Sequence, residues 1–495
     1  MTGPPPSAPL PRWAAALDGL ANRLYGSRFN PLYQAGTIAV VLLVVLLITG
    51  LWLLLFYRIG APWASVAALT ASPWTGNWVR GLHRYASDGA IVAAVVHLGR
   101  MFLQRRSWGP RVLAWLSGVG LLGLLFVCGW TGYVLVWDTF GEKLAVEGAR
   151  IIDALPILSE PLERTFTGER PIPSAFFFVN LFLHVALPLG LGLGLWLHVS
   201  RVSRPVLLPP RPLWVGVVVL LTAVAIARPL AMAPEADPFR LAATIPVDWF
   251  YAFWLPLHAS LPPWGAWAGV VTLVGGLISV PWLTRPSKAK SEASRVDSRL
   301  CTGCEQCAHD CPYEAITMVG RTDGRAKLVA RIDPDRCVSC AICAGSCDVS
   351  AVGPPGRNGR DQAAWAEARF GPTEVAGRLV ILTCDHAARP RAKPDSAVHA
   401  TVRCVGSIHA AVIGQVLTAG ARGIVIVGCP PRDCWHREGS RWAAERLVGR
   451  QEARWPTPTK DPRVRLVDSG DPGSLRAAID SLEAQAGASP AAADR

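Results

Sequence analysis

The stretch NWVRGLHRYASDGAIVAAVVHLGR, residues 77–100, carries two histidines fourteen positions apart within an apolar run. Fourteen residues are just under four turns of an α-helix, so His83 and His97 face nearly the same way, about 21 Å apart along the axis. An ionisable side chain inside a membrane is costly and marks a functional site by default. The stretch therefore predicts a membrane-spanning helix with two functional positions on one face.

A second stretch, FFFVNLFLHVALPLGLGLGLWLH at residues 176–198, repeats the spacing with His184 and His198. If two such helices lie antiparallel, the four imidazoles form two opposed couples. Each couple is suited to bind one haem through both axial positions, which favours electron transfer over oxygen chemistry. A single membrane histidine is equally well explained as a hydrogen-bonded polar residue, but two pairs at one spacing favour haem ligation.

Glycines repeat the same step in two other apolar runs. Gly36 and Gly50 lie fourteen residues apart in the first run, and Gly118 and Gly132 fourteen apart in the third. Because glycine has no Cβ, a flat macrocycle can lie against the helix backbone at such a position. We therefore predict that two further helices face the two haems at these four glycines.

Residues 12–285 resemble cytochrome b of the cytochrome bc and chloroplast-type complexes, on the two histidine stretches and on CGWTGYVLVWD at 128–138. The resemblance implies two b-type haems held by the four histidines, with Arg80 and Arg100 on the haem propionates. Chloroplast-type relatives carry a cysteine for a third, covalent haem where this chain has Gln34. The resemblance thus implies two haems b and no covalent one.

Apolar content is concentrated before residue 285 and predicts an all-α transmembrane bundle of about six spans. The expected spans are residues 36–57, 80–103, 112–137, 174–200, 213–232 and 264–284. The first residues lack the charged-then-apolar layout of a signal peptide. Residues 12–30 instead predict an amphipathic helix on the membrane surface.

Loop charges predict the orientation of the spans. The loops at 100–111 and 201–211 are rich in arginine and lack acids, whereas the loop at 138–171 carries seven acidic side chains. Positive loops stay in the cytoplasm, so we expect a bacterial or archaeal cytoplasmic membrane with both termini inside. The net charge of +13 then reflects topology. Nucleic-acid binding is disfavoured, because no basic stripe interleaved with aromatics is present.

Segment 237–262 resembles the loop of the family's outer quinol site, which carries a Pro-Glu-Trp-Tyr tetrad. Here the tetrad is Val247-Asp248-Trp249-Phe250, followed by Tyr251. Asp248 stands at the glutamate position, and its side chain is one methylene shorter. Its carboxylate remains able to accept a proton from a quinol hydroxyl. The candidate catalytic residues are therefore Asp248, Trp249 and Tyr251, with quinone as substrate. The alternative is a degenerate loop that no longer binds quinol.

An inner quinone site is expected by position near His198. The family often has a further histidine five residues on, where this chain has Ser203 flanked by Arg201 and Arg204.

Two cysteine runs follow a polar linker at residues 286–297. CTGCEQCAHDCP and CVSCAICAGSC share the C-x2-C-x2-C-x3-C spacing of a bacterial ferredoxin with two 4Fe–4S clusters. In that pattern the fourth cysteine of each run binds the other cluster. The expected ligand sets are Cys301, Cys304, Cys307 and Cys347 for one cluster, and Cys337, Cys340, Cys343 and Cys311 for the other. A cytoplasmic location disfavours disulfides, and eight cysteines in this rhythm disfavour zinc.

From residue 376, short β-branched runs alternate with helical stretches, which predicts an α/β domain with a parallel sheet. Ligands of such sheets collect beyond the carboxyl ends of the strands. Cys384, Cys404 and Cys429 all fall at those ends, with Cys434 five residues further. Four thiols at one edge predict a 2Fe–2S cluster. Structural cysteines without a cluster are the alternative.

Residues 376–450 resemble the delta, iron–sulfur subunit of the methyl-viologen-reducing hydrogenases, on VRCVGSIHAAVIGQVLTAGARGIVIVGCPPRDCWHREG. That family passes electrons to a flavin-containing subunit of heterodisulfide reductase. Its first motif usually has two cysteines three apart, whereas TCDHA has only Cys384. The chain itself lacks a GxGxxG or Walker signature in the required context, so flavin or nicotinamide chemistry is expected in a partner.

The predicted organisation is multidomain: a transmembrane bundle, an α+β bacterial ferredoxin fold and an α/β domain. The expected boundaries are 1–35 for the N-terminal segment, 36–285 for the bundle, 286–297 for the linker, 298–355 for the ferredoxin and 376–485 for the delta-like domain. The iron–sulfur domains are expected in the cytoplasm.

The predicted function is a membrane-bound oxidoreductase subunit that links the quinone pool to a soluble cytoplasmic partner. That partner is a flavoprotein of the heterodisulfide-reductase or NAD(P)H type, or a hydrogenase. One alternative is a non-catalytic haem and iron–sulfur anchor. Another is a quinol oxidase subunit of the bc type with a ferredoxin tail, working with a Rieske protein and cytochrome c. Assembly of the chain as a homodimer is a further alternative.

Overall fold

The computed structural model describes residues 10–74, 76–155, 157, 159–166, 172–200, 202–237, 248–258, 261–285, 292–325, 327–387, 394, 396–449 and 463–487. The expected tetrad residue Val247, most of the linker and Arg201 lie outside these residues. The chain forms two compact units. One comprises Gln34–Arg201 and Pro205–Arg285, and the other Met1–Tyr33, Val202–Arg204 and Pro286–Arg495.

Among the described residues, five helices of the first unit are long and apolar enough to cross a membrane. They are α2 (Ala35–Leu54), α4 (Asn77–Leu103), α5 (Val112–Val136), α7 (Ser174–Ser200) and α10 (Pro263–Leu283). The sixth expected span, 213–232, corresponds to α8 (Arg211–Ala227), whose 17 residues fall short of the ~20 that a bilayer requires. That helix ends before Pro229, because proline disfavours helix at the residue before it.

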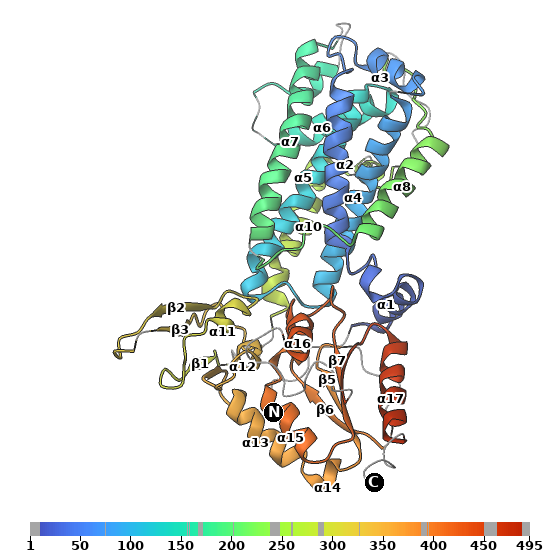
Figure 1. Cartoon of the computed structure of the whole chain (residues 1–495). Helices are drawn as coiled ribbons and strands as arrows, with labels where there is room; N and C mark the ends of the chain where they lie inside the picture. The colour runs from blue at the N-terminus through green and yellow to red at the C-terminus, as the bar shows by residue number, and fades with distance from the viewer. Residues whose placement is uncertain are drawn as a thin grey trace. The chain divides into compact units, whose positions relative to one another are not determined.

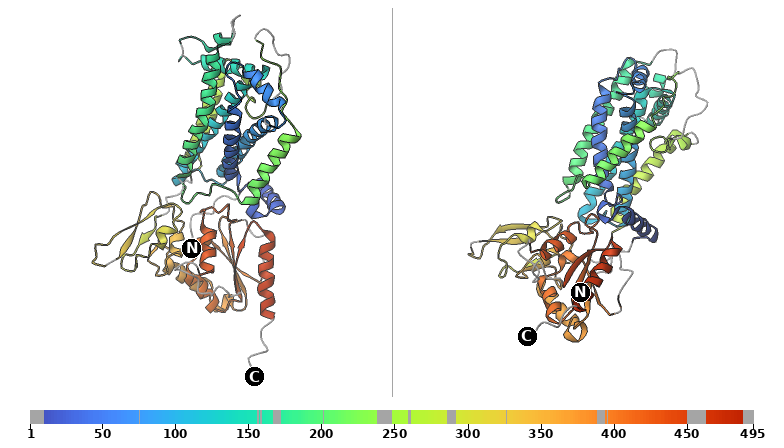
Figure 2. Two further views of the ribbon diagram at one scale, coloured as in Figure 1. Left: turned by 45° about the horizontal axis from the view of Figure 1, so that its top comes forward. Right: turned by 45° about the vertical axis from the view of Figure 1, so that its right-hand side comes forward.

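Helix α2 packs along α4, and α5 packs along α7, so the four long helices lie side by side (Figures 1 and 2). Small and branched side chains fill the space between them, among them Leu42, Leu82, Ala86 and Ala90. Large apolar side chains such as Ile48 point outward, as expected where lipid is the solvent.

Shorter elements close the ends of this unit. They are α3 (Pro62–Ala71), α6 (Thr139–Asp153), α9 (Leu255–His258), η2 (Gly109–Arg111) and η3 (Leu162–Phe166). Helix α6 begins where Asp138 accepts a hydrogen bond from the backbone N–H of Gly141, 2.9 Å away. This side-chain cap supplies one of the partners that a helix start lacks.

In the second unit, helix α1 (Arg12–Tyr25) and η1 (Ser27–Phe29) precede the ferredoxin-like region. That region has two antiparallel pairs of strands, β1 (Arg295–Val296) with β4 (Val352–Gly353) and β2 (Ile316–Gly320) with β3 (Leu328–Ile332). One short helix contains the third cysteine of each run: α11 (Gln306–His309) contains Cys307, and α12 (Ile342–Gly345) contains Cys343.

The last region is built on a parallel sheet in the order β6-β5-β7-β8, as the strand–helix alternation predicts. Its strands are β5 (Leu379–Cys384), β6 (Val398–Val402), β7 (Gly423–Gly428) and β8 (Val464–Asp468). Its helices are α13 (Gly359–Arg369), α14 (Pro372–Val375), α15 (Ala410–Thr418), α16 (Gly439–Leu447) and α17 (Pro472–Gly487), with η4 at Val405–Ser407.

Helix α17 covers one face of the sheet, and α13 and α15 cover the other (Figure 1). The expected start of the domain at residue 376 leaves out α13, although Ala366 and Phe370 belong to the buried core of the sheet. A capping box begins this helix: Asn358 accepts from the backbone of Asp361, whose side chain accepts from the backbone of Asn358.

Candidate functional site

Each predicted glycine of the bundle faces one predicted histidine. A Cβ built on Gly50 would lie 3.2 Å from the His83 ring, and one on Gly36 only 2.9 Å from the His97 ring. On the other pair of helices, the same Cβ distances are 3.0 Å from Gly132 to His184 and 3.2 Å from Gly118 to His198. The four histidines and four glycines therefore lie at two levels. Both helix pairs, α2 with α4 and α5 with α7, contribute one histidine and one glycine to each level.

The His83 and His184 rings are neighbours, with their centroids 6.4 Å apart and their planes at 60° to each other. Two bonds of about 2 Å from a metal to imidazole nitrogen, plus the two ring radii, span about 6 Å. The separation thus fits one iron held between the two rings.

Hydroxyl groups lie within hydrogen-bond distance of the Nδ1 atom of three of these imidazoles. Thr49 Oγ1 lies 2.8 Å from His83 Nδ1, Thr131 Oγ1 3.0 Å from His184 Nδ1, and Ser117 Oγ 2.9 Å from His198 Nδ1. Each hydroxyl also donates to a carbonyl of its own helix, for example Thr49 to Val45 at 2.7 Å. It therefore accepts from the Nδ1–H of the imidazole, which leaves Nε2 as the atom for iron.

The sequence prediction missed these three hydroxyl residues, although a signal was present. Each stands one position before a glycine of the fourteen-residue series, and at the fourth such position the chain has Ala35. A small hydroxyl residue beside glycine reaches a facing ring, because nothing larger separates the two helices.

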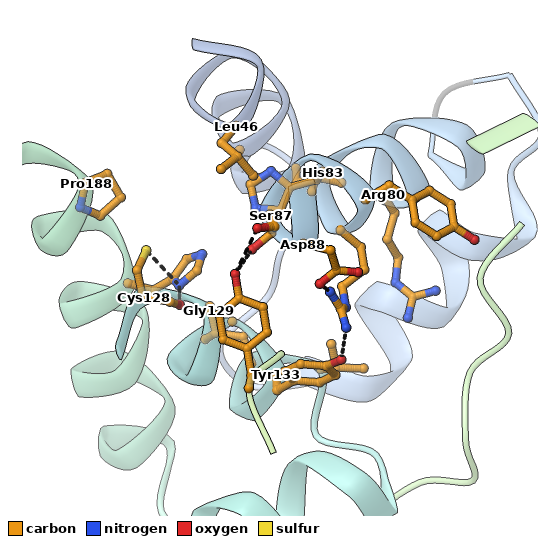
Figure 3. A pocket seen from close by; sticks show the side chains of 18 of the residues that line it. Leu46, Arg80, His83, Ser87, Asp88, Cys128, Gly129, Tyr133 and Pro188 are labelled. Carbon is orange, nitrogen blue, oxygen red and sulfur yellow. Dashed lines mark hydrogen bonds and ion pairs between the residues drawn. The ribbon is translucent and has the colours of Figure 1, made fainter. Parts of the chain in front are cut away.

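A cavity of about 890 Å³ surrounds the level of His83 and His184. Its wall is mostly apolar and includes Gly50, Gly132, Asp248 and Tyr251. Arg80 and His83 line the same cavity (Figure 3). The Arg80 guanidinium donates to Thr70 Oγ1 at 3.1 Å and to the Leu230 carbonyl at 3.2 Å. A cavity of this size and polarity accommodates a large flat ligand with one charged edge.

Arg100, the second predicted propionate ligand, lies in the last turn of α4, three residues after His97. Ser203 and Arg204 follow α7, where the sequence predicts an inner quinone site. This site remains a prediction.

The segment around Asp248 is bound into the wall of this cavity. Asp248 Oδ1 accepts from the backbone N–H of Tyr251 at 2.6 Å and of Phe250 at 2.9 Å. Its other oxygen accepts from Arg84 at 2.5 Å and from the Tyr133 hydroxyl. Although burial raises the pKa of Asp248, these hydrogen bonds and the Arg84 charge hold it below its ordinary value. The group is therefore a paired carboxylate at neutral pH.

Tyr251 lies inside the cavity wall and Trp249 does not. Tyr251 is 1% exposed, and its hydroxyl lies 2.5 Å from Ser87 Oγ. Its ring lies against Gly129, where a Cβ would come within 2.1 Å of it. Trp249 is 77% exposed, so the structure brings two of the three predicted catalytic residues together.

The first ferredoxin set, Cys301, Cys304, Cys307 and Cys347, lines a small cavity of about 20 Å³. In the second set, burial raises the pKa of the Cys340 thiol, and the nearby thiols of Cys311, Cys343 and Cys337 raise it further. Iron bound by these thiols would offset this penalty, because metal ligation deprotonates a thiol outright.

Backbone amides point at several of these sulfurs. Ala315 N–H donates to Cys311 Sγ at 3.4 Å, and Ala351 N–H donates to Cys347 Sγ at 3.2 Å. Both donors lie four residues after the cysteine, so the two runs repeat one local geometry. Among the described residues, no three His, Cys, Asp or Glu side chains close around a single ion. The arrangement fits clusters, in which each thiolate binds a separate iron.

The four C-terminal cysteines are all buried at one edge of the parallel sheet. Cys384 ends β5, and its Sγ lies 3.6 Å from that of Cys429, which directly follows β7. Cys404 and Cys434 both lie against Gly439, whose Cβ would come within 2.3 and 3.5 Å of their sulfurs. All four predicted ligands are therefore brought together.

Helices long and apolar enough to cross a membrane, opposed histidines and grouped thiols define a membrane-bound electron-transfer protein. Residues 20–205 match the family model of cytochrome b/b6, and 300–351 match the 4Fe–4S dicluster domain. Residues 381–478 match the delta subunit of methyl-viologen-reducing hydrogenase. These matches confirm the three resemblances and their order along the chain.

Individual relatives cover the first of these regions. The cytochrome b subunit of menaquinol:cytochrome c reductase from Geobacillus thermodenitrificans is 28% identical over 34% of this chain and 79% of its own length. The subunit of that name from Bacillus subtilis is 29% identical over 32% of this chain and 74% of its own. A solved structure titled "Hyperthermophilic respiratory Complex III" is 16% identical, with a TM-score of 0.41, over 51% of this chain and 75% of that one. The similarity to cytochrome b implies haem b, and the dicluster match implies iron–sulfur clusters.

Proposed function

We propose that this chain is an oxidoreductase subunit that connects the quinone pool to a soluble cytoplasmic redox partner. It would do so through two haems b, two 4Fe–4S clusters and one 2Fe–2S cluster, which carry single electrons when bound. The observation that carries the proposal is the combination in one chain of two glycine–histidine levels and three groups of thiols.

Within the bundle, the residues of the chain hold and orient the haems. The four imidazoles would offer Nε2 to iron, and hydroxyl groups fix the Nδ1 atoms of three of them, so these three rings keep one orientation. The facing glycines leave room for the macrocycle. Arg80 and Arg100 supply positive charge for the propionates at the two levels.

At the outer level, Asp248 and Tyr251 would hold the quinone head group beside His83. The Tyr251 hydroxyl is tied to Ser87 and is able to share its hydrogen bond with a quinone oxygen. Asp248 keeps the loop closed through two backbone N–H groups and neutralises Arg84.

We propose electron flow from a low-potential donor through the clusters to quinone, because ferredoxin clusters usually lie at lower potential than haem b. The donor would be a flavoprotein docked beside Cys384 and Cys429, on the cytoplasmic side.

Quinone analogues test this function directly. Added to the purified protein, they should shift the absorbance of the outer haem, and quinol should reduce it in the absence of other subunits. Tyr251→Phe should weaken both effects, whereas Glu160→Gln, an exposed acid on a loop, should leave them unchanged.

A second candidate is a relay anchor without a quinone site, and the bonding of Asp248 favours it. Both carboxylate oxygens already accept hydrogen bonds, so this side chain has little capacity left for a substrate proton. Under this alternative, analogues leave the haem spectrum unchanged while reduced clusters still reduce the haems.

A further inference from the structure

Arg446, on α16, is a fully buried charge between the ferredoxin-like region and the sheet domain. Its side chain is 0% exposed, as is that of its ion-pair partner Asp310, 3.4 Å away. A buried guanidinium is tolerated only where its donors are satisfied. Arg446 meets that condition by donating to the Gly406 carbonyl at 2.6 Å and to Ser346 Oγ at 2.8 Å.

Each partner of Arg446 is a near neighbour of one predicted cluster ligand. Asp310 directly precedes Cys311, and Ser346 directly precedes Cys347. Gly406 lies two residues after Cys404. One side chain thus ties together three segments, and each segment carries a ligand of a different predicted cluster.

The contact surface between the ferredoxin-like region and the sheet domain is so closely packed that it leaves no room for added side-chain atoms at two glycines. A Cβ on Gly345 would lie 2.6 Å from Arg446 Nη1, and one on Gly406 would lie 2.7 Å from the backbone of Gly439. Trp442, one turn before Arg446 and 1% exposed, donates its indole N–H to the Asp310 carbonyl at 3.1 Å. Helix α16 is therefore anchored to the segment before Cys311 by two side chains.

Across this surface, the two domains bring particular thiols together. Cys340 and Cys404 belong to one buried apolar cluster with Ile342 and Trp442. Cys304, from the other ferredoxin set, is exposed. The Cys340 set is therefore the one that faces the thiols of the sheet domain.

We propose that electrons pass between the ferredoxin and the C-terminal cluster at Cys340 and Cys404, and that Arg446 is the positioning residue for this transfer. This rests on the proposed function, in that both thiol groups must carry clusters. One electron leaves the cluster at Cys404 and enters the cluster of the Cys340 set, with no bond or proton exchanged. The fixed charge of Arg446 stabilises the added negative charge, so it also raises the reduction potentials of its neighbours.

Redox titration of the full-length protein, followed by electron paramagnetic resonance, tests the role of Arg446. In Arg446→Met, the equilibrium constant for reducing the Cys340-set cluster should fall about tenfold, or about 59 mV for one electron. Arg446→Lys keeps the charge and should recover most of this shift. The matched control is Arg441→Met, on the same helix but half exposed, which should leave potentials unchanged. Equal potentials in wild type and Arg446→Met would overturn the proposal.

Spin coupling tests the route separately. In the fully reduced protein, the signal of the C-terminal cluster should be broadened by a ferredoxin cluster. Cys340→Ser should change this broadening and Cys304→Ser should not; the reverse result sinks the assignment. If Arg446→Met fails to fold, Trp442→Phe loses only the indole bond to Asp310 and should weaken the same coupling. An iron content of about eight rather than ten would instead refute the C-terminal cluster of the proposed function, while the potential shift would still be measurable.

Discussion

The haem-binding bundle and the iron–sulfur half hold their predicted ligands in different ways. In the bundle, each histidine depends on one glycine and, at three positions, on one hydroxyl from the facing helix. In the iron–sulfur half, backbone amides donate to two of the thiols, and Arg446 bonds residues beside ligands of all three predicted clusters. We therefore expect that replacing one side chain in the bundle affects one haem level alone. In the iron–sulfur half, one replacement can affect several clusters, because the same contacts hold their ligands.

The largest effect should come from removing a histidine, which tests whether the levels are separable. His83→Ala and His184→Ala should each lose the outer haem and keep the inner one, because each haem needs both axial ligands. His97→Ala and His198→Ala should do the reverse. Haem content by pyridine haemochrome and low-temperature spectra of the purified variants distinguish the outcomes.

Loss of both haems from any single variant would contradict separable levels. It would show that the bundle, and not each histidine couple, is the unit that binds haem.

The next effect concerns the iron–sulfur half. The anaerobically purified protein should hold about ten cluster iron atoms, about eight in two 4Fe–4S clusters and about two in a 2Fe–2S cluster. Cys429→Ser should lose about two, because its sulfur lies beside that of Cys384 in the buried group. It should also disconnect a bound flavoprotein from the haems while quinol still reduces them.

Unchanged iron in this variant would mean that the four C-terminal thiols are structural. Unchanged coupling to the flavoprotein would mean that electrons enter at the ferredoxin directly.

These two halves also differ in how far the sequence predicts them. The haem levels follow from helical arithmetic, because a fourteen-residue step on a regular helix fixes which side chains share a face. The convergence of Cys384, Cys404 and Cys429 follows from parallel strands that end at one edge.

Other features depended on tertiary contacts that no local pattern encodes. Arg446 lies on an amphipathic helix, and its burial involves Asp310 and Ser346, which are far from it in the sequence. The exposure of Trp249 beside buried Tyr251 depends on how the loop folds around Asp248. The length of α8 was overestimated because apolar residues continue past the proline that ends the helix.

A smaller effect is expected from filling one of the glycine positions. Gly132→Val places a branched side chain where even a Cβ lies 3.0 Å from the His184 ring. The imidazole must tilt or the helices must separate, at a cost of about 1–3 kcal/mol. Outer-haem occupancy should fall and its low-spin spectrum should shift. Gly123→Val, on the same helix with open space around its Cβ, is the control and should retain both haems.

The smallest effect should come from the hydroxyl that holds His83. Thr49→Val keeps the shape of the side chain but removes the oxygen that accepts from His83 Nδ1. Such an acceptor makes the imidazole a stronger donor to iron and stabilises the oxidised state. Its loss should therefore raise the reduction potential of the outer haem, by the equivalent of about 1 kcal/mol for one hydrogen bond. Thr222→Val, whose hydroxyl bonds only its own helix at Val218, should leave both potentials unchanged. A shift of the inner haem alone would place Thr49 at the wrong level, whereas a lower outer potential would mean that the hydroxyl donates to the imidazole instead of accepting from it.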